Sequence, residues 1–248
     1  KLVLVDQDEE ALNKVTDELS KTTEVLKIVA DVTEENNIYD AVDKAMDQFG
    51  EIDLLVNDAG VAVPGPIWEL PTRDWEWILH ADLMSQVYAL RKVIPIMMKQ
   101  ENGGDILNVA SAAGLLTAPG MPAYYATKFA VVGMSEAVAY DLQAYKQDKI
   151  HIHVFTPAFV QTHLMHSEEY RPAKYTDKTD PYYQSKAFKM GQEMAVKDLT
   201  TGLPMDTVPD TIFKGLENND FYILTHKGIA PLVVKRAKDA VEGKAPNL

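Results

Sequence analysis

Tyr124 and Lys128 lie four residues apart, and Ser111 precedes Tyr124 by thirteen positions. Residues i and i+4 share one face of a helix, so the phenol and the ammonium are expected to point into the same cleft. A free tyrosine titrates at about pH 10, and a neighbouring ammonium lowers that pKa by stabilising the phenolate. The hydroxyl of Ser111 can donate a hydrogen bond to a substrate oxygen as charge develops on it. Together the three side chains predict a site that moves a proton on or off an alcohol or carbonyl oxygen.

Each of these residues also has a simpler interpretation when it is taken alone. Tyr124 could be a core tyrosine, Ser111 a hydroxyl at the end of a strand, and Lys128 a solvated helix lysine. The residues that follow the lysine, at 129–132 (Phe-Ala-Val-Val), are all apolar, so a lysine at this position needs a functional reason. Tyr125 is a competing tyrosine, but a helix turns it about 100° away from Tyr124.

Strand and helix patterns alternate along the chain, as they do in doubly wound parallel sheets. Strands are predicted at 2–6, 25–30, 52–56, 105–109, 150–156 and 221–225, and the two longest helices at 75–99 and 122–145. The first strand is apolar on both faces and is predicted to be buried. The helix that follows it is expected to turn Leu12, Val15 and Leu19 inward. We therefore predict an α/β fold with a doubly wound, Rossmann-type parallel sheet, in a single domain over residues 1–248.

The ordered set of motifs resembles the short-chain dehydrogenase/reductase family over essentially the whole chain. Ser111, Tyr124 and Lys128 fall on the family's Ser and Tyr-x-x-x-Lys positions. Three more segments resemble family motifs: Val-Asn-Asp-Ala-Gly at 56–60, Pro-Ala-Phe-Val-Gln-Thr at 157–162 and Asp-Val at 31–32. A lone Tyr-x-x-x-Lys is a weak signal, whereas the set in this order and at family spacing is a specific one.

The resemblance implies an enzyme that uses NAD. In such an enzyme the tyrosine transfers the proton, the lysine lowers its pKa and holds the nicotinamide ribose, and the serine orients the substrate oxygen. The segment 163–205, rich in aromatic and methionine side chains, would form a lid over the substrate, although such side chains also suit a packed lid or a subunit contact. The cofactor-binding residues implied are Asp6, Asp31, Val32, Asn57, Ala59, Gly60, Tyr124, Lys128, Pro157, Val160 and Thr162. Among them, the asparagine is expected to satisfy backbone groups between strands rather than to do chemistry.

A glycine-rich turn, which dinucleotide-binding folds place after their first strand, is not found, since the chain contains no Gly-x-Gly. The acidic residue that binds the ribose follows such a turn by about 20 residues. If Asp6 is that residue, the strand at 2–6 is the second strand of the dinucleotide-binding fold. About 25 to 35 residues, with the fold's first strand and the glycine-rich turn, would then precede Lys1. A carboxylate there accepts a hydrogen bond from a free ribose hydroxyl and repels a 2′-phosphate, which favours NAD over NADP. The alternative is that Asp6 only caps the helix that follows.

Three residues depart from the family pattern. Asp82 stands where the family has an asparagine that supports a water relay to the lysine, and an ionised aspartate accepts hydrogen bonds but donates none. We expect Asp82 to contact Lys128 through water and to retune the relay, or to be kept protonated by burial. Asp58 adds a carboxylate in a region that is usually neutral. Ala158 replaces a glycine, which would strain the backbone if φ is positive there.

Composition argues against several classes of function. The net charge of −13, without a run of Lys or Arg, argues against nucleic-acid and anionic-membrane binding. The chain has no cysteine, and His151 and His153 share a strand face without a third ligand, so no metal site is expected. No stretch is long and apolar enough to cross a bilayer, and no signal-peptide pattern is present, so we expect a cytoplasmic protein.

The sequence therefore predicts an NAD(H)-dependent oxidoreductase that interconverts a secondary alcohol and a ketone, with Ser111, Tyr124, Lys128 and Asp82 as catalytic residues. Its expected partners are a small alcohol or ketone and further copies of the chain.

A homodimer or homotetramer is expected through the two longest helices, where Met84, Val87 and Val131 are compatible with a subunit contact. The alternative is a catalytically impaired, dehydrogenase-like protein that serves in binding or assembly. The missing glycine-rich turn, Asp82 and Asp58 favour that alternative, and the complete Ser-Tyr-Lys set speaks against it.

Overall fold

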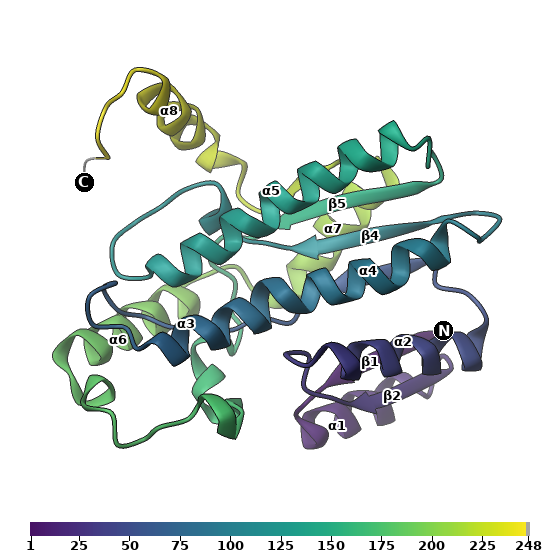
Figure 1. Ribbon diagram of the computed structural model, residues 1–248, viewed down its shortest axis with the longest axis horizontal. Coiled ribbons are helices and arrows are strands. Elements are labelled where there is room, and N and C mark those ends of the chain that lie inside the picture. Colours follow the sequence, from purple (N-terminus) through teal and green to yellow (C-terminus); the bar gives the residue numbers. More distant parts are fainter. Residues whose placement is uncertain (247–248) are drawn as a thin grey trace.

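The computed structural model describes residues 1–246, apart from the side chains of residues 194, 195 and 198. In the described chain, six strands form two parallel sheets (Figure 1). The first sheet pairs β1 (Leu2–Asp6) with β2 (Val25–Val29). The second has the order β3–β4–β5–β6, whose bounds are Leu54–Asn57, Gly104–Val109, Ile150–Thr156 and Tyr222–Leu224. The predicted α/β fold with parallel strands is confirmed, although the strands lie in two sheets rather than in one.

Helices connect the strands and cover the faces of the sheets. Their bounds are α1 (Glu9–Leu19), α2 (Glu35–Phe49), α3 (Thr72–Ile78), α4 (Ser85–Met97), α5 (Pro122–Ala144), α6 (Lys186–Thr200), α7 (Val208–Glu217) and α8 (Ala230–Val241). In Figure 1, α4 and α5 run across one face of the second sheet, α7 lies behind that sheet, and α8 stands apart from it. Among the described helices, none is long and apolar enough to cross a membrane.

The apolar stripe of α2 shows how the sequence pattern produces the main core. Ile38, Ala41, Val42 and Ala45 recur at helical spacing and are buried on one face, and Gly50, with a φ of 83°, ends the helix. This face packs against α4, and the same apolar cluster includes buried side chains of β4 and β5. The main core thus joins α2 to β4 and β5 of the second sheet.

The facing edges of the two sheets border an open cleft, because no strand in the described chain pairs with the free edge of β1 or β3. Leu2 and Val5 are 37% and 38% exposed, and Val56 of β3 is 48% exposed. In the described chain β1 is therefore only partly buried, because no strand lies beside its free edge. Val15 is 43% exposed, so the expectation that it turns inward is wrong.

The helix predicted at 75–99 runs continuously from α3 to α4, but Leu79–Met84 between them form a π-helical segment. A π turn accommodates an extra residue per turn and is frequent at functional sites. This segment packs against α5 and carries Asp82, whose side chain is completely buried.

The segment 163–205, called the lid segment below, begins with 3-10 turns at Leu164–Tyr170, Ala173–Tyr175 and Pro181–Gln184 and continues into α6. A β-bridge between Val160 and Leu203 brings its end back beside its start.

Candidate active site

The three side chains singled out from the sequence reach one cleft from two neighbouring elements. Ser111 follows the carboxyl end of β4 with an extended backbone, and Tyr124 and Lys128 lie in the first two turns of α5. Pro122 is at the start of this helix, where its missing N–H costs no hydrogen bond. All three side chains line a cleft of about 730 Å³. Open α/β sheets bind their ligands at this carboxyl edge of the strands.

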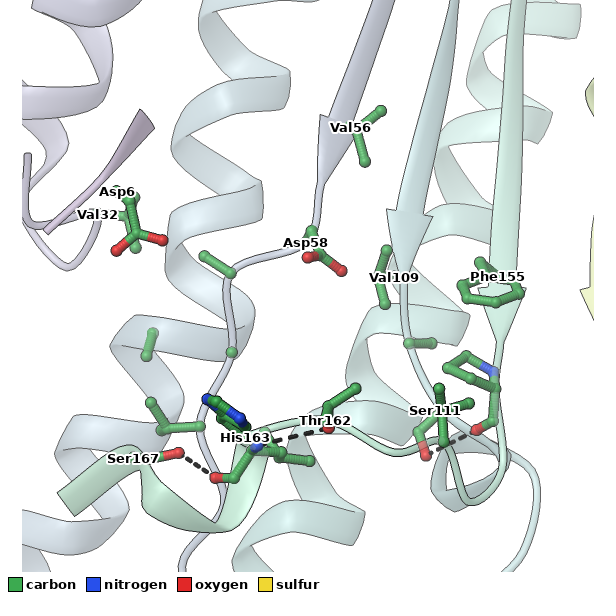
Figure 2. A pocket seen from close by; sticks show the side chains of 18 of the residues that line it. Asp6, Val32, Val56, Asp58, Val109, Ser111, Phe155, Thr162, His163 and Ser167 are labelled. Atoms are coloured by element: carbon green, nitrogen blue, oxygen red, sulfur yellow. Dashed lines mark hydrogen bonds between the residues drawn. The ribbon is translucent and has the colours of Figure 1, made fainter. Parts of the chain in front are cut away.

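Both sheets contribute to the cleft, and Figure 2 shows Asp6 and Val32 on one wall, with Asp58 and Val109 on the other. The predicted cofactor residues that line it are Asp6, Asp31, Val32, Ala59, Gly60, Tyr124, Lys128, Pro157, Val160 and Thr162. Asn57 is the exception, because its side-chain amide donates a hydrogen bond to Asn108 Oδ1 at 2.8 Å, between β3 and β4. That contact agrees with the structural role expected for this asparagine.

Asp82 and Lys128 form a buried ion pair behind the cleft. Asp82 Oδ2 lies 3.1 Å from Lys128 Nζ, and the two side chains are 0% and 4% exposed. Asp82 Oδ1 accepts a hydrogen bond from the backbone N–H of Val61 at 2.7 Å. Asp82 Oδ2 is buried, and its contact is this ion pair rather than a hydrogen bond. The expectation of a contact through water is therefore wrong, since the two charged groups meet directly.

The pKa values of this pair follow from burial and from their mutual attraction. Burial acts to lower the pKa of Lys128, but the charges of Asp82 and Tyr124 outweigh it, and the pKa lies above its ordinary value. Burial raises the pKa of Asp82, while Lys128 and the Val61 N–H act against that rise. The ammonium is therefore held in its charged form next to the cleft.

Burial also raises the pKa of Tyr124, and the charge of Asp82 adds to this rise. Lys128, whose Nζ lies 5.5 Å from the centroid of the phenol ring, and a hydrogen bond with Ser111 act in the opposite direction. The lysine thus acts on the tyrosine as predicted. The expected net decrease of the pKa is wrong, because burial is the larger effect.

The hydroxyl of Ser111 is held at the end of β4 by the following segments. It donates to the carbonyl oxygen of Pro157 at 3.3 Å and accepts from the backbone N–H of Ala113 at 3.1 Å. The N–H of Ala112 donates to the same Pro157 oxygen at 2.7 Å. The predicted 157–162 segment is therefore fixed against the serine loop at the edge of the cleft.

Carboxylates mark the other end of the cleft. Asp6 Oδ1 accepts from the N–H of Asp8 at 2.9 Å, and it is Asp8 that caps α1, by accepting from the N–H of Ala11. The alternative that Asp6 itself caps the helix is therefore wrong, because Asp8 occupies the cap position. Asp31 Oδ1 accepts from both the N–H and the hydroxyl of Thr33, at 2.9 and 2.7 Å.

The two other departures from the family pattern have different outcomes. Asp58 faces the cleft (Figure 2), where desolvation raises its pKa, Lys128 lowers it and Asp6 adds to the rise. Ala158 does not have the predicted strain, because in the described chain the residues other than glycine with positive φ are Lys146 and Asn219.

Sequence reasoning missed Gln86, which supports the ion pair. Its side chain is 1% exposed, and Nε2 donates at 3.3 Å to the carbonyl oxygen of Val109, which lies 3.4 Å from Lys128 Nζ. The available signal was its spacing, because a polar residue four positions after Asp82 shares its helix face.

The histidines contact acidic and backbone groups, and no group of three metal-binding side chains occurs in the described part of the chain. His153 is completely buried, with Nε2 3.0 Å from Asp105 Oδ1 and Nδ1 2.8 Å from the carbonyl oxygen of Asp220. His151 Nδ1 lies 3.3 Å from the same Asp105 oxygen. These contacts agree with a structural role. His163, in the lid segment, lines the cleft beside Thr162 (Figure 2).

The parallel strands, the covering helices and the cleft at the carboxyl edge define an α/β protein of the Rossmann type. A family model described as short chain dehydrogenase matches residues 1–172, and the chain belongs to the short-chain dehydrogenase/reductase family. This confirms the resemblance inferred from the motifs.

Individual relatives support the same assignment. The chain is 58% identical to the CLA biosynthesis dehydrogenase/reductase of Lactiplantibacillus plantarum, over 100% of this chain and 87% of that protein. It is 35% identical to 3beta-hydroxysteroid dehydrogenase 2 of Eggerthella lenta, over 64% of this chain and 61% of that protein. The crystal structure of a short-chain dehydrogenase/reductase from Burkholderia phymatum in complex with NAD has a TM-score of 0.94 and 32% identity, over 100% of this chain and 88% of that one.

Proposed function

We propose that this protein is an NAD(H)-dependent oxidoreductase that interconverts a secondary alcohol and a ketone. The observation that carries the proposal is that Ser111, Tyr124 and Lys128 line the same cleft as the carboxylate of Asp6. A proton-transfer group, an oxygen-orienting hydroxyl and a ribose-binding carboxylate are thus within reach of one ligand. The similarity to a protein named as a dehydrogenase/reductase supports this reaction type.

The residues at the cleft fit a dinucleotide. A Cβ at Gly60 would lie 3.3 Å from Asp82 Oδ2 and 3.4 Å from Lys128 Nζ, so the glycine keeps the space beside the ion pair free. In the proposed arrangement Asp6 holds the ribose of the adenosine, the 31–32 pair contacts adenine, and the 157–162 segment covers the nicotinamide. When NAD is bound, it supplies the acceptor or donor of the hydride. The carboxylate of Asp6 and the similarity to an NAD complex favour NAD over NADP.

The chain's own side chains handle the proton. In the oxidation Tyr124 takes the proton of the substrate hydroxyl, and in the reduction it returns a proton to the carbonyl oxygen. The ammonium of Lys128 stabilises the phenolate, and Ser111 donates to the substrate oxygen. Asp82 does not line the cleft, so we assign it as a positioning residue that acts through Lys128 rather than as a catalytic residue.

We also propose a homodimer or homotetramer formed through α4 and α5. Val131 is 0% exposed and cannot contribute, whereas Met84 and Val87 are partly exposed and Tyr140 on α5 is 71% exposed. Light scattering after size-exclusion chromatography tests this assembly, and a monomer at micromolar concentration would contradict it.

The experiment that tests the function is a titration of the purified protein with NADH, followed by nicotinamide fluorescence, with NADPH for comparison. A panel of secondary alcohols and ketones is then assayed at 340 nm with wild-type protein and Tyr124→Phe. Saturable binding that favours NADH, together with turnover that depends on Tyr124, supports the proposal.

Binding without turnover by the wild type would instead favour an impaired dehydrogenase-like binding protein. The extra carboxylates Asp58 and Asp82 are the observations that favour this second candidate.

A further inference from the structure

The lid segment is joined to α3 by a buried ionic contact. Arg171 Nη1 donates to Asp74 Oδ1 at 2.5 Å, and the two side chains are 3% and 1% exposed. Arg171 Nε donates to Glu168 Oε2 at 2.9 Å, and a second contact joins Nη2 to the same carboxylate. A guanidinium so deeply buried requires anionic partners, because an unpaired buried charge is strongly unfavourable.

The same guanidinium also contacts aromatic groups from both sides of the junction. It lies over the ring of Trp77, 4.1 Å from the centroid. Its Nη1 is 3.2 Å from the Tyr183 hydroxyl, which donates to Asp74 Oδ1 at 2.6 Å. A further bond of 3.3 Å reaches the carbonyl oxygen of Tyr175. Arg171 therefore contacts three separate parts of the lid segment, at Glu168, Tyr175 and Tyr183. It joins all of them to Asp74 of α3.

The contact between Arg171 and α3 lies next to the cleft. Trp77 is one of its lining residues, and Leu164, Ser167 and Tyr170, in the turn just before Arg171, are others. Ser167 and His163 appear beside Thr162 in Figure 2, in the same cleft as Ser111. The Arg171 contact therefore directly adjoins this wall of the cleft.

A second arginine makes a matched comparison within the same molecule. Arg73 pairs with Asp180 and, at 3.7 Å, with Asp177, so it also joins α3 to the lid segment. Its side chain and that of Asp180 are each 25% exposed. This pair is partly exposed, so water screens it more than it screens the Arg171 pair.

We propose that Arg171 is a positioning residue for substrate binding: through Asp74 and Trp77 it fixes the 164–170 wall of the cleft opposite Ser111 and Tyr124. The inference rests on the proposed function for the substrate, an alcohol or ketone, but the fixing of the wall is a property of the chain itself. Arg171 touches neither the reacting atoms nor the cofactor site in this arrangement.

The test compares Arg171→Met with the control Arg73→Met in the full-length protein. Methionine keeps much of the length and apolar character of the side chain but removes the charge. We expect Arg171→Met to raise KM for the secondary alcohol about tenfold or more, with kcat within about threefold, because ground-state and transition-state binding are lost equally. NADH affinity by fluorescence should be unchanged. The Arg73 variant should resemble the wild type in every measurement.

Hydrogen exchange supplies a readout that does not need turnover. Amides of residues 164–170 should exchange faster in Arg171→Met and not in Arg73→Met, if the buried arginine fixes this wall. If the wild type turns over no alcohol or ketone, the proposed function fails, and exchange alone decides the positioning role.

Equal effects of the two arginine variants, or a loss of kcat at unchanged KM, would overturn the proposal. If Arg171→Met does not fold, as judged by its thermal transition, Asp74→Asn takes its place. The asparagine keeps the shape and an acceptor oxygen for Tyr183 but removes the charge that faces Arg171. A rise in KM and faster exchange at 164–170 are expected, and the absence of both would refute the assignment.

Discussion

Replacing Asp82 with asparagine should shift the pH dependence of alcohol oxidation to lower pH. The wild-type carboxylate raises the pKa of Tyr124, and it also raises that of Lys128. Oxidation requires the phenolate of Tyr124 as base, so its rate rises with pH through the tyrosine pKa. Asp82→Asn removes a buried negative charge while it keeps the size of the side chain and an acceptor for the Val61 N–H.

The magnitude follows from two distances. Lys128 Nζ lies 3.1 Å from the Asp82 carboxylate and 5.5 Å from the centre of the Tyr124 ring, so the carboxylate and the ring are separated by at most the sum of these distances. At about 9 Å and an effective dielectric constant of about 20, the interaction of a unit charge with the phenolate is about 1.8 kcal/mol. We expect the midpoint of the rate profile to fall by about one pH unit.

The assay measures kcat for a secondary alcohol at saturating NAD between pH 6 and pH 11, for the wild type, Asp82→Asn and Asp141→Asn. Asp141 lies near the far end of α5 and is exposed, so its removal changes the net charge equally without acting on Tyr124. A midpoint that stays in place or rises in Asp82→Asn, or one that falls equally in the Asp141 variant, would refute the reasoning.

Three more outcomes follow from the site. Tyr124→Phe should abolish turnover and keep NADH affinity within about twofold, because the ring remains and only the hydroxyl is lost; turnover at a near-normal rate would contradict the proton-transfer role. The melting temperature should be highest below about pH 10 and fall above it. The pKa values of Tyr124 and Lys128 are raised in the folded chain, so these groups stabilise the fold only while they keep their protons. The decrease in melting temperature should be smaller in Tyr124→Phe. Gly114→Ala should lower the free energy of unfolding by about 1–3 kcal/mol, because the new Cβ would lie 2.7 Å from the carbonyl oxygen of Lys128. Gly133→Ala is the matched control, since a Cβ at Gly133 meets nothing within 4 Å. Both variants are measured by denaturant unfolding.

Much of the fold and most members of the site were predictable from local pattern. The strands at 2–6 and 150–156 were predicted with the bounds that the structure shows. The helix that carries Tyr124 and Lys128 was marked by Pro122 at its start. Spacing alone therefore placed the phenol and the ammonium on one face.

The sequence pattern could not predict the distances between residues that lie in different helices or segments. Asp82 lies in the π-helical segment and Lys128 lies on α5, so spacing within one helix could not predict their direct contact. The net pKa of Tyr124 depends on how much protein surrounds it, which spacing does not reveal. Arg171 and Asp74 are 97 residues apart, and nothing local in either segment marks them as partners.

The cleft has a thermodynamic consequence, because its two walls come from segments that are far apart in the sequence. A ligand that contacts both walls binds the folded arrangement and adds RT ln(1 + [L]/Kd) to its stability. Binding in the cleft therefore raises the temperature at which the chain unfolds, by an amount that grows with ligand concentration.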